Sequence, residues 1–203
     1  MKQDGRLPFG QLPALQVDDQ LLVQSAAILR FVGKLANLYP TGSGSDDIYA
    51  AKIDAAMDEE ADMFVGLSVS RYKGKVSTAP LQRHRFSSSI DVRLERFGFG
   101  YMSPDDVKVV RQSLNDEVLP RHLTFLENLM RLSSTGWIAG GPDPSIADFA
   151  LVPRLQWLCE PGVHDGIDCG ILDSYPLLGG LIQRFMALPS VDAYYKSRTQ
   201  LVK

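Results

Sequence analysis

Strand signals in this chain are confined to a short stretch near its beginning. Residues 14–17 (Ala-Leu-Gln-Val) and 20–23 (Gln-Leu-Leu-Val) are two short apolar runs, separated by Asp18 and Asp19. Two such runs joined by two turn-forming residues predict a β-hairpin. Because the remaining sequence is mostly helical in pattern, we predict a mainly α fold.

A helical period follows the hairpin. Apolar residues recur at one-, three- and four-residue intervals, as on one face of an α-helix; they are Ile28, Leu29, Val32, Leu35 and Ala36. Ser25 lies just before this face, and its hydroxyl is expected to cap the helix by accepting a bond from a free backbone N–H. Pro40 then ends the helical region.

A small linker separates this first part from the rest of the chain. Residues 40–45 read Pro-Thr-Gly-Ser-Gly-Ser, a composition typical of flexible connections. We therefore predict a partial first domain at 1–39, a linker at 40–46 and an all-helical domain at 47–203.

Two long helices are expected in the second part. The first runs from Asp46 to about Tyr72 and begins with two acids, which suit the positive N-terminal end of a helix. The second opens at Pro104, with Ser103 as its N-cap, and continues to about Leu132. Pro120 should kink or break it, because proline lacks the N–H that a helix interior uses.

The segment between these helices breaks the pattern. Residues 73–103 contain glycines, a proline and three consecutive serines, and are predicted to form an insertion or long loop with a short helix at 90–97. Basic residues are frequent from Arg71 to Arg96. They could form a site for an anionic ligand or a partner, but a solvated loop is the simpler interpretation.

A capping box predicts the next helix. Ser145 is followed three residues later by Asp148, so the serine can cap the helix while the acid reaches back to the serine N–H. We expect this helix to end at about Leu158, and further helices at 176–188 and 191–199.

Composition excludes several classes of protein. The formal net charge is −3, which does not suggest a nucleic-acid binder, and no apolar stretch is long enough to span a membrane. The first residues lack the apolar core of a secretory signal. Two cysteines are too few for a disulfide scaffold and fit a reducing compartment. We therefore predict a cytoplasmic protein that acts without nucleic acid or membrane.

Three motifs, taken in order, carry a resemblance to a known family. They are residues 9–15 (Phe-Gly-Gln-Leu-Pro-Ala-Leu), 24–30 (Gln-Ser-Ala-Ala-Ile-Leu-Arg) and 144–149 (Pro-Ser-Ile-Ala-Asp-Phe). In this order the chain resembles the cytosolic glutathione S-transferases, most closely the sigma, pi and alpha branch. The resemblance implies a helical carboxy-terminal domain after a truncated thioredoxin-like α/β segment, a homodimer, and glutathione as co-substrate with a hydrophobic electrophile.

The resemblance also implies a glutathione site. The Leu12–Pro13 bond would be cis, and the main chain of Leu12 would pair with the cysteinyl part of glutathione, with Gln11 beside it. If Pro13 is considered without the other motifs, the alternative is an ordinary trans proline at the start of a strand. Gln24 and Ser25 would hold the γ-glutamyl carboxylate where a helix begins, a position that favours anions. Helix capping by Ser25 is compatible with that role.

Two residues of the second part also match family positions. Asp62 matches an acid that reaches across a dimer interface toward the amino group of glutathione, although it could equally be one acid on a solvated face. Tyr72 matches a position that lines the electrophile pocket in some members, although a tyrosine at a helix end is more often a packing residue.

The family's thioredoxin-like domain opens with a strand, a helix and a second strand before the proline. Because Pro13 comes so early, no residue here can be assigned as the catalytic tyrosine. Met1 is therefore interpreted as an internal methionine of a longer enzyme that conjugates glutathione to electrophiles, or performs related isomerase or peroxidase chemistry. The alternative is a non-catalytic glutathione-binding or scaffolding protein on the same fold.

No metal site is predicted. The spacing of Cys159, His164 and Cys169 does not match a structural zinc motif, so loop residues and a packed thiol are the simpler interpretation. His122 has no evident partner in the sequence.

Overall fold

The computed structural model describes residues 7–71, 104–160 and 166–201. Within them the chain forms one hairpin followed by helices. The elements are β1 (Ala14–Val17), β2 (Gln20–Val23), α1 (Ser25–Leu35), α2 (Ser45–Arg71), α4 (Pro104–Ser113), the π-helical turn η1 (Leu114–Val118), α5 (Leu119–Leu132), α6 (Ile146–Leu158), the 3₁₀ turn η2 (Ile171–Ser174), α7 (Pro176–Met186) and α8 (Pro189–Leu201). Tyr72, the segment 73–103 and the short helix predicted at 90–97 lie outside the described residues.

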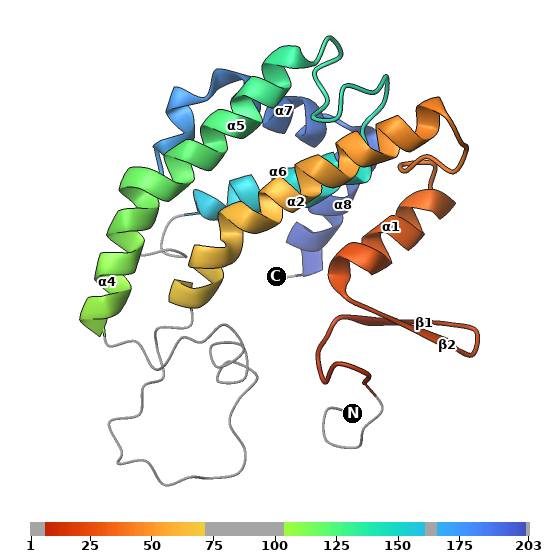
Figure 1. Ribbon diagram of the computed structural model, residues 1–203, viewed down its shortest axis with the longest axis horizontal. Helices are drawn as coiled ribbons and strands as arrows, with labels where there is room; N and C mark the ends of the chain where they lie inside the picture. Colours follow the sequence, from red (N-terminus) through yellow and green to blue (C-terminus); the bar gives the residue numbers. More distant parts are fainter. Residues whose placement is uncertain (1–6, 72–103, 161–165, 202–203) are drawn as a thin grey trace, which may run out of the picture.

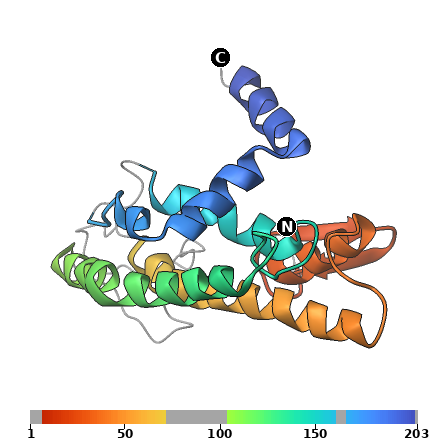
Figure 2. The same cartoon turned by 90° about the horizontal axis from the view of Figure 1, so that it is seen from above.

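The mainly α fold is confirmed. Figure 1 shows the hairpin and α1 at one side of a group of longer helices, with α2 and α5 crossing in front of α6 and α7. Helix α6 contacts α1, α2 and α7, so it links the first part of the chain to the bundle. Figure 2 shows α8 projecting away from the other helices. No helix among the described residues is long and apolar enough to cross a membrane.

The core lies between the helices of the second part. Its largest fully buried side chains come from α2, α5, α6 and α7, together with the loop before α6; they include Ile53, Phe64, Leu123, Ile138, Leu155 and Phe185. The first part of the chain only borders this core, through the partly buried Leu29, Leu38 and Tyr39. The hydrophobic centre of the described chain is therefore helical, and the hairpin sits at its margin.

The predicted hairpin is confirmed with its register. β1 and β2 pair antiparallel, with Ala14 opposite Val23 and Val17 opposite Gln20, so Asp18 and Asp19 form the two-residue connection. Asp18 has a φ of 49°, a left-handed conformation that aspartate tolerates better than most residues.

The cap expected at the start of α1 is wrong. Ser25 is the first residue of the helix, Gln24 occupies the N-cap position, and no side-chain hydrogen bond caps this end. The other end of α1 is closed by a Schellman motif, in which Asn37 has a φ of 56°. The N–H of Leu38 donates to the Gly33 carbonyl at 2.8 Å, which satisfies a carbonyl that the helix would leave free.

Pro120 interrupts its helix as predicted, through a wide turn. The N–H of Leu119 donates to the carbonyl of Leu114, five residues earlier, which makes η1 π-helical. Leu114 and Leu119 are both buried although they lie five positions apart, a spacing that one continuous α-helical face would not allow. The extra residue thus realigns the apolar faces of α4 and α5.

The capping box at α6 is confirmed. Asp148 is fully buried, and its Oδ2 accepts from the Ser145 N–H at 2.8 Å and from the Ser145 hydroxyl at 3.1 Å. Its Oδ1 accepts from the Ile138 N–H at 2.9 Å. Burial raises the pKa of Asp148, and these hydrogen bonds oppose that shift. The carboxylate therefore joins the start of α6 to the preceding loop.

Helix α1 is attached to the bundle at this same place. The N–H of Ile146 donates to the Leu38 carbonyl at 3.0 Å. Gly33 is buried against the Ile146 side chain, which occupies the space that a Cβ at position 33 would need. The absence of a side chain at Gly33 is thus what lets α1 approach α6 so closely.

We expect the substitution Asp148→Ala to lower the free energy of unfolding by about 2–4 kcal/mol, because it leaves buried N–H groups of Ile138 and Ser145 without their charged acceptor. Chemical denaturation followed by circular dichroism measures this change. The exposed Asp143 lies in the same loop, so Asp143→Ala should shift stability by no more than about 0.5 kcal/mol. Equal effects of the two substitutions would contradict the role given to Asp148.

Candidate functional site

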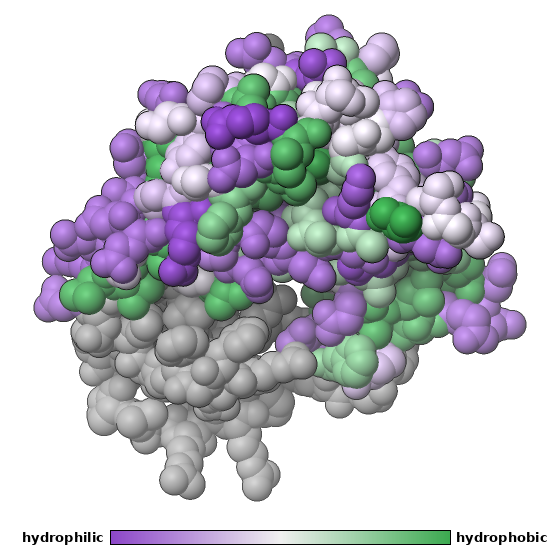
Figure 3. Space-filling model, turned by 45° about the horizontal axis from the view of Figure 1, so that its top comes forward, coloured by the Kyte–Doolittle hydropathy of each residue, from purple (hydrophilic) through white to green (hydrophobic). Residues whose placement is uncertain are grey.

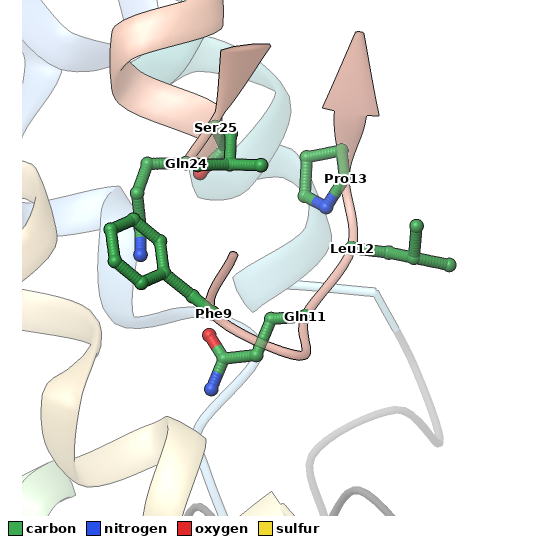
Figure 4. A pocket seen from close by; sticks show the side chains of 7 residues that line it. Phe9, Gln11, Leu12, Pro13, Gln24 and Ser25 are labelled. Atoms are coloured by element: carbon green, nitrogen blue, oxygen red, sulfur yellow. The ribbon is translucent and has the colours of Figure 1, made fainter. Parts of the chain in front are cut away.

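A small open pocket lies where the hairpin meets α1. It has a volume of about 60 Å³ and is lined by residues from the turn before β1, the end of β2 and the start of α1. The lining residues are Phe9, Gln11, Leu12, Pro13, Val23, Gln24 and Ser25. All five residues predicted for the first part of the glutathione site, Gln11, Leu12, Pro13, Gln24 and Ser25, therefore meet in one place (Figure 4).

Leu12 lines the pocket with its main chain. The Leu12–Pro13 peptide bond is cis, as the motif predicts. The Leu12 side chain is 55% exposed and points away from the pocket, as Figure 4 shows. Among the described residues, the backbone of Leu12 makes no backbone hydrogen bond, since the β1 ladder begins at Ala14. Its N–H and C=O remain available to an extended ligand.

Gln24 holds an unusual backbone conformation at the rim of the pocket. Its φ of 74° and ψ of 121° lie in a sparsely populated region for a residue with a side chain. This conformation turns the chain directly from β2 into α1. Such a conformation costs on the order of 1–3 kcal/mol and is concentrated at functional sites. In Figure 4 the Gln24 side chain lies beside the Phe9 ring.

The N-terminus of α1 opens onto the same pocket. Ser25 is its first residue, and its exposed hydroxyl makes no capping bond. The first N–H groups of a helix have no partner within the helix, and the helix dipole adds a partial positive charge there. An uncapped helix start beside the available main chain of Leu12 suits a ligand that combines a carboxylate with a peptide group.

The other predicted site residues are not in this pocket. Asp62 is exposed on α2 and does not line it. None of the tyrosines in the described ranges lines it either. The Tyr39 hydroxyl donates to Asp54 at 2.9 Å, and the Tyr49 hydroxyl packs against Gly141. Burial, followed by the nearby acids Asp148 and Asp143, raises the pKa of Tyr49.

A polar cluster that the sequence did not reveal ties α1 to α2. Arg30 donates from Nε to Oδ1 of Asp54 at 2.8 Å, while Tyr39 donates to the other carboxylate oxygen. Burial, followed by the hydrogen bond to Asp54, raises the pKa of Tyr39. The three side chains lie on separate parts of the chain, so only the folded arrangement brings them together. They fix the pocket relative to the bundle.

The pocket lies in a part of the molecule where few side chains are buried. Of residues 7–40, only Leu7 and Gly33 are buried. On α1, Val32 is 43% exposed and Leu35 is 71% exposed. Figure 3 shows apolar side chains gathered toward the side of the molecule where α1 and the hairpin lie. The pocket therefore depends on a few contacts with α2 and α6 rather than on a core of its own.

Two further predictions concern metals and His122. Within the described ranges, no three His, Cys, Asp or Glu side chains are grouped as metal ligands; His164 lies outside those ranges. The expectation that His122 lacks a partner is wrong, because its Nδ1 lies 2.6 Å from Oε1 of Glu59 on α2. This pair joins α5 to α2 away from the pocket.

Comparisons with known proteins agree on one family. Residues 90–198, more than half of the chain, match the family model "Glutathione S-transferase, C-terminal domain". Glutathione S-transferase alpha-5 of Rattus norvegicus is 26% identical over 98% of this chain and 72% of its own length. Glutathione S-transferase P 10 of Caenorhabditis elegans is 28% identical over 94% of this chain and 70% of its own length.

A solved structure shows the same fold. The pi-class glutathione S-transferase of Onchocerca volvulus superposes with a TM-score of 0.65 at 24% sequence identity. The match covers 97% of this chain and 75% of that chain. The family match begins at residue 90, so it includes the last part of the segment predicted as an insertion.

We expect Asp54→Ala to loosen the part of the chain that carries the pocket. Loss of this acceptor frees Arg30 and Tyr39, so the amides of α1 should exchange with solvent about tenfold faster while those of α6 stay unchanged. Hydrogen exchange read by mass spectrometry measures both. Asp58 provides the matched control, because its side chain is 80% exposed and its Oδ1 lies 4.0 Å from Nη2 of Arg30. Asp58→Ala should leave the amides of α1 protected from exchange. Similar exchange in the two variants would show that the cluster does not hold α1.

Proposed function

Because this chain belongs to the glutathione S-transferase family, we propose that it binds glutathione in the pocket between Leu12 and the start of α1. One observation carries this proposal: the uncapped N-terminus of α1 and the available main chain of Leu12 face the same small pocket. Glutathione contains a terminal carboxylate at its γ-glutamyl end and a peptide-like cysteinyl centre. The pocket offers a matching group for each.

In this proposal the ligand runs along the pocket as an extended chain. The cysteinyl part pairs with the backbone of Leu12, in the manner of an added strand. Gln11 lies beside that part of the ligand. The γ-glutamyl carboxylate lies at the helix start, where Gln24 and the Ser25 hydroxyl can donate to it. The unusual backbone of Gln24 is consistent with a residue positioned for binding rather than for stability.

The proposed activity is transfer of the glutathione thiol to a hydrophobic electrophile. A free thiol has a pKa near 8.5, so only a few per cent is thiolate at pH 7. Lowering that pKa by about two units requires about 2.7 kcal/mol of preferential stabilisation of the thiolate. A hydroxyl that hydrogen-bonds to the sulfur is one way to supply it.

A binding or scaffolding role is the second candidate, and one observation favours it. No tyrosine from the described ranges lines the pocket, and Ser25 is the only hydroxyl-bearing residue in its lining. In the proposed pose Ser25 binds the carboxylate rather than the thiol. The described residues therefore support glutathione binding more directly than thiol activation.

Several other features of the family are proposed here as well. We propose that residues 1–39 form the glutathione-binding domain, linked through 40–46 to a helical domain at 47–203. The protein would act as a homodimer in the cytoplasm, without metal, nucleic acid or membrane. Asp62 is exposed on α2, as it must be to reach the amino group of glutathione in a partner subunit. Tyr72 would border the electrophile.

We expect Ser25→Ala to weaken glutathione binding about tenfold, because a hydrogen bond to a charged carboxylate contributes about 1.5–3 kcal/mol and the helix N–H groups remain. Isothermal titration calorimetry with glutathione measures the change. Alanine is a good helix former, so the fold should persist. Ser43→Ala, at an exposed loop serine outside the pocket, is the matched control and should bind like the unaltered chain. Equal affinities for all three proteins would exclude the proposed carboxylate position.

Turnover of a chromogenic aryl halide with glutathione separates the two candidate functions. A rate well above the uncatalysed reaction, abolished by competing glutathione analogues, would support transfer and overturn a binding-only role. Binding in the calorimeter without turnover would support the second candidate. Neither binding nor turnover would contradict both.

A further inference from the structure

Two consecutive acids on α2 contact different neighbouring helices. Oε1 of Glu59 lies 2.6 Å from Nδ1 of His122 on α5. Oε1 of Glu60, the next residue, lies 3.0 Å from Nη1 of Arg154 on α6. Helix α2 therefore contacts α5 and α6 through adjacent carboxylates. None of these four residues lines the proposed glutathione pocket, so an inference about them does not depend on that proposal.

Glu60 is buried to an extent that is unusual for a charged residue. It is 6% exposed, and it lies on the core-facing side of α2 together with the buried Met57 and Phe64. Its Oε1 has no hydrogen-bond partner among the described residues, so the close contact with Arg154 is an ion pair without hydrogen-bond geometry. A buried carboxylate needs both an opposite charge and hydrogen bonds to offset its lost hydration. Oε1 of Glu60 has the first without the second.

Arg154 is the exposed member of this ion pair. Its side chain is 47% exposed, and its guanidinium carbon lies 5.0 Å from the centre of the Phe64 ring. The guanidinium can therefore stay in place over the aromatic ring and in contact with water without Glu60. Because solvent screens a half-exposed cation, its attraction repays only part of the cost of burying the carboxylate. Burial accordingly raises the pKa of Glu60, and the opposing effect of Arg154 does not cancel this shift.

Other ionisable groups packed around α2 have partners of their own. His122 of α5 pairs with Glu59, and Glu127 of α5 accepts from the start of α7. Asp148 of α6 holds the loop before that helix, and Arg111 is the buried cation of α4. The acids of η1, Asp116 and Glu117, are exposed. Within the described part of the chain, Arg154 is the one charged group that acts on the pKa of Glu60.

We propose that Glu60 and Arg154 form a proton-controlled contact between α2 and α6. In mild acid, Glu60 takes up one proton from solvent and remains in the core as a neutral group, while Arg154 is released from its buried partner. At higher pH the proton returns to solvent and the ion pair forms again. The folded chain thus holds this proton more tightly than the unfolded chain, in which Glu60 is hydrated.

This preference determines how stability changes with pH at the α2–α6 contact. The contribution of neutral Glu60 is fully present below the ordinary glutamate pKa of 4.5 and is lost as the pH rises through the raised pKa of the folded protein. A glutamate in a well-compensated surface ion pair would behave in the opposite way, because its stabilising form is the charged one. The sign of the pH dependence therefore distinguishes the proposed contact from an ordinary salt bridge.

The test follows the whole chain by nuclear magnetic resonance from about pH 4 to about pH 8, with isotope-labelled glutamate and arginine. The side-chain carboxyl resonance of Glu60 is assigned through the backbone and by its loss in Glu60→Gln. We expect it to titrate at a higher pH than glutamate in a model peptide, and the side-chain resonances of Arg154 to change with the same midpoint. Titration at or below the model-peptide value, or an Arg154 signal that does not follow Glu60, would overturn the proposal.

Arginine variants test the partner of Glu60. Arg154→Gln removes the charge and keeps part of the stem that packs over Phe64, so the Glu60 titration should move to a still higher pH. Arg131→Gln, at an exposed position of α5, is the matched control and should leave the titration unchanged. Equal titrations in these two variants would show that Arg154 does not act on Glu60.

Urea denaturation over the same pH range gives an independent readout. Glu60→Gln imitates the neutral acid, so the urea midpoint of the unaltered protein should fall relative to that of Glu60→Gln as the pH rises. Glu59→Gln, at the neighbouring acid, is the matched control and should keep the Glu60 titration seen by magnetic resonance. A gap between the unaltered protein and Glu60→Gln that stays constant or closes as the pH rises would contradict the proposal.

Discussion

The arrangement of the described structure depends on the buried carboxylate of Asp148, because its hydrogen bonds hold the start of α6 in place. One of its oxygens holds the N-cap residue Ser145, and the other holds the backbone of Ile138. With the start of α6 set in this way, the N–H of Ile146 is directed at the Leu38 carbonyl, which secures α1. A charge in the helical core thus determines where the hairpin and its pocket lie. Such a charge is tolerated because several donors surround it.

Local signals in the sequence predicted most of the elements. The acidic pair at Asp18 and Asp19, the helix start at Pro104, the break at Pro120 and the capping box at Ser145 each act over a few residues, so each could be read without the fold. The motif positions likewise predicted that Leu12 and Ser25 would share one pocket. Their role toward glutathione stays a prediction.

The sequence did not predict features that depend on contacts between distant parts of the chain. Glutamine is not a preferred N-cap residue, and nothing in the sequence shows that Gln24 would adopt a positive φ there. The salt bridge between Arg30 and Asp54 joins separate helices. So does the buried Glu127 of α5, whose two oxygens accept from the first N–H groups of α7 at 3.1 Å each. Tertiary packing, rather than local preference, decides such contacts.

The wide turn at η1 has a consequence for the length of this segment. If α4 and α5 formed one regular α-helix, their core-facing residues would follow a single 3.6-residue period. The π-helical turn η1 contains one residue more than the same turn of a regular α-helix. Leu114 and Leu119 remain buried on either side of the surplus residue. Here a chain can therefore gain or lose a single amino acid without exchanging its core-facing positions for solvent-facing ones. An alignment of relatives that places a one-residue gap beside Pro120 would describe a physical difference in the helix rather than an error of matching.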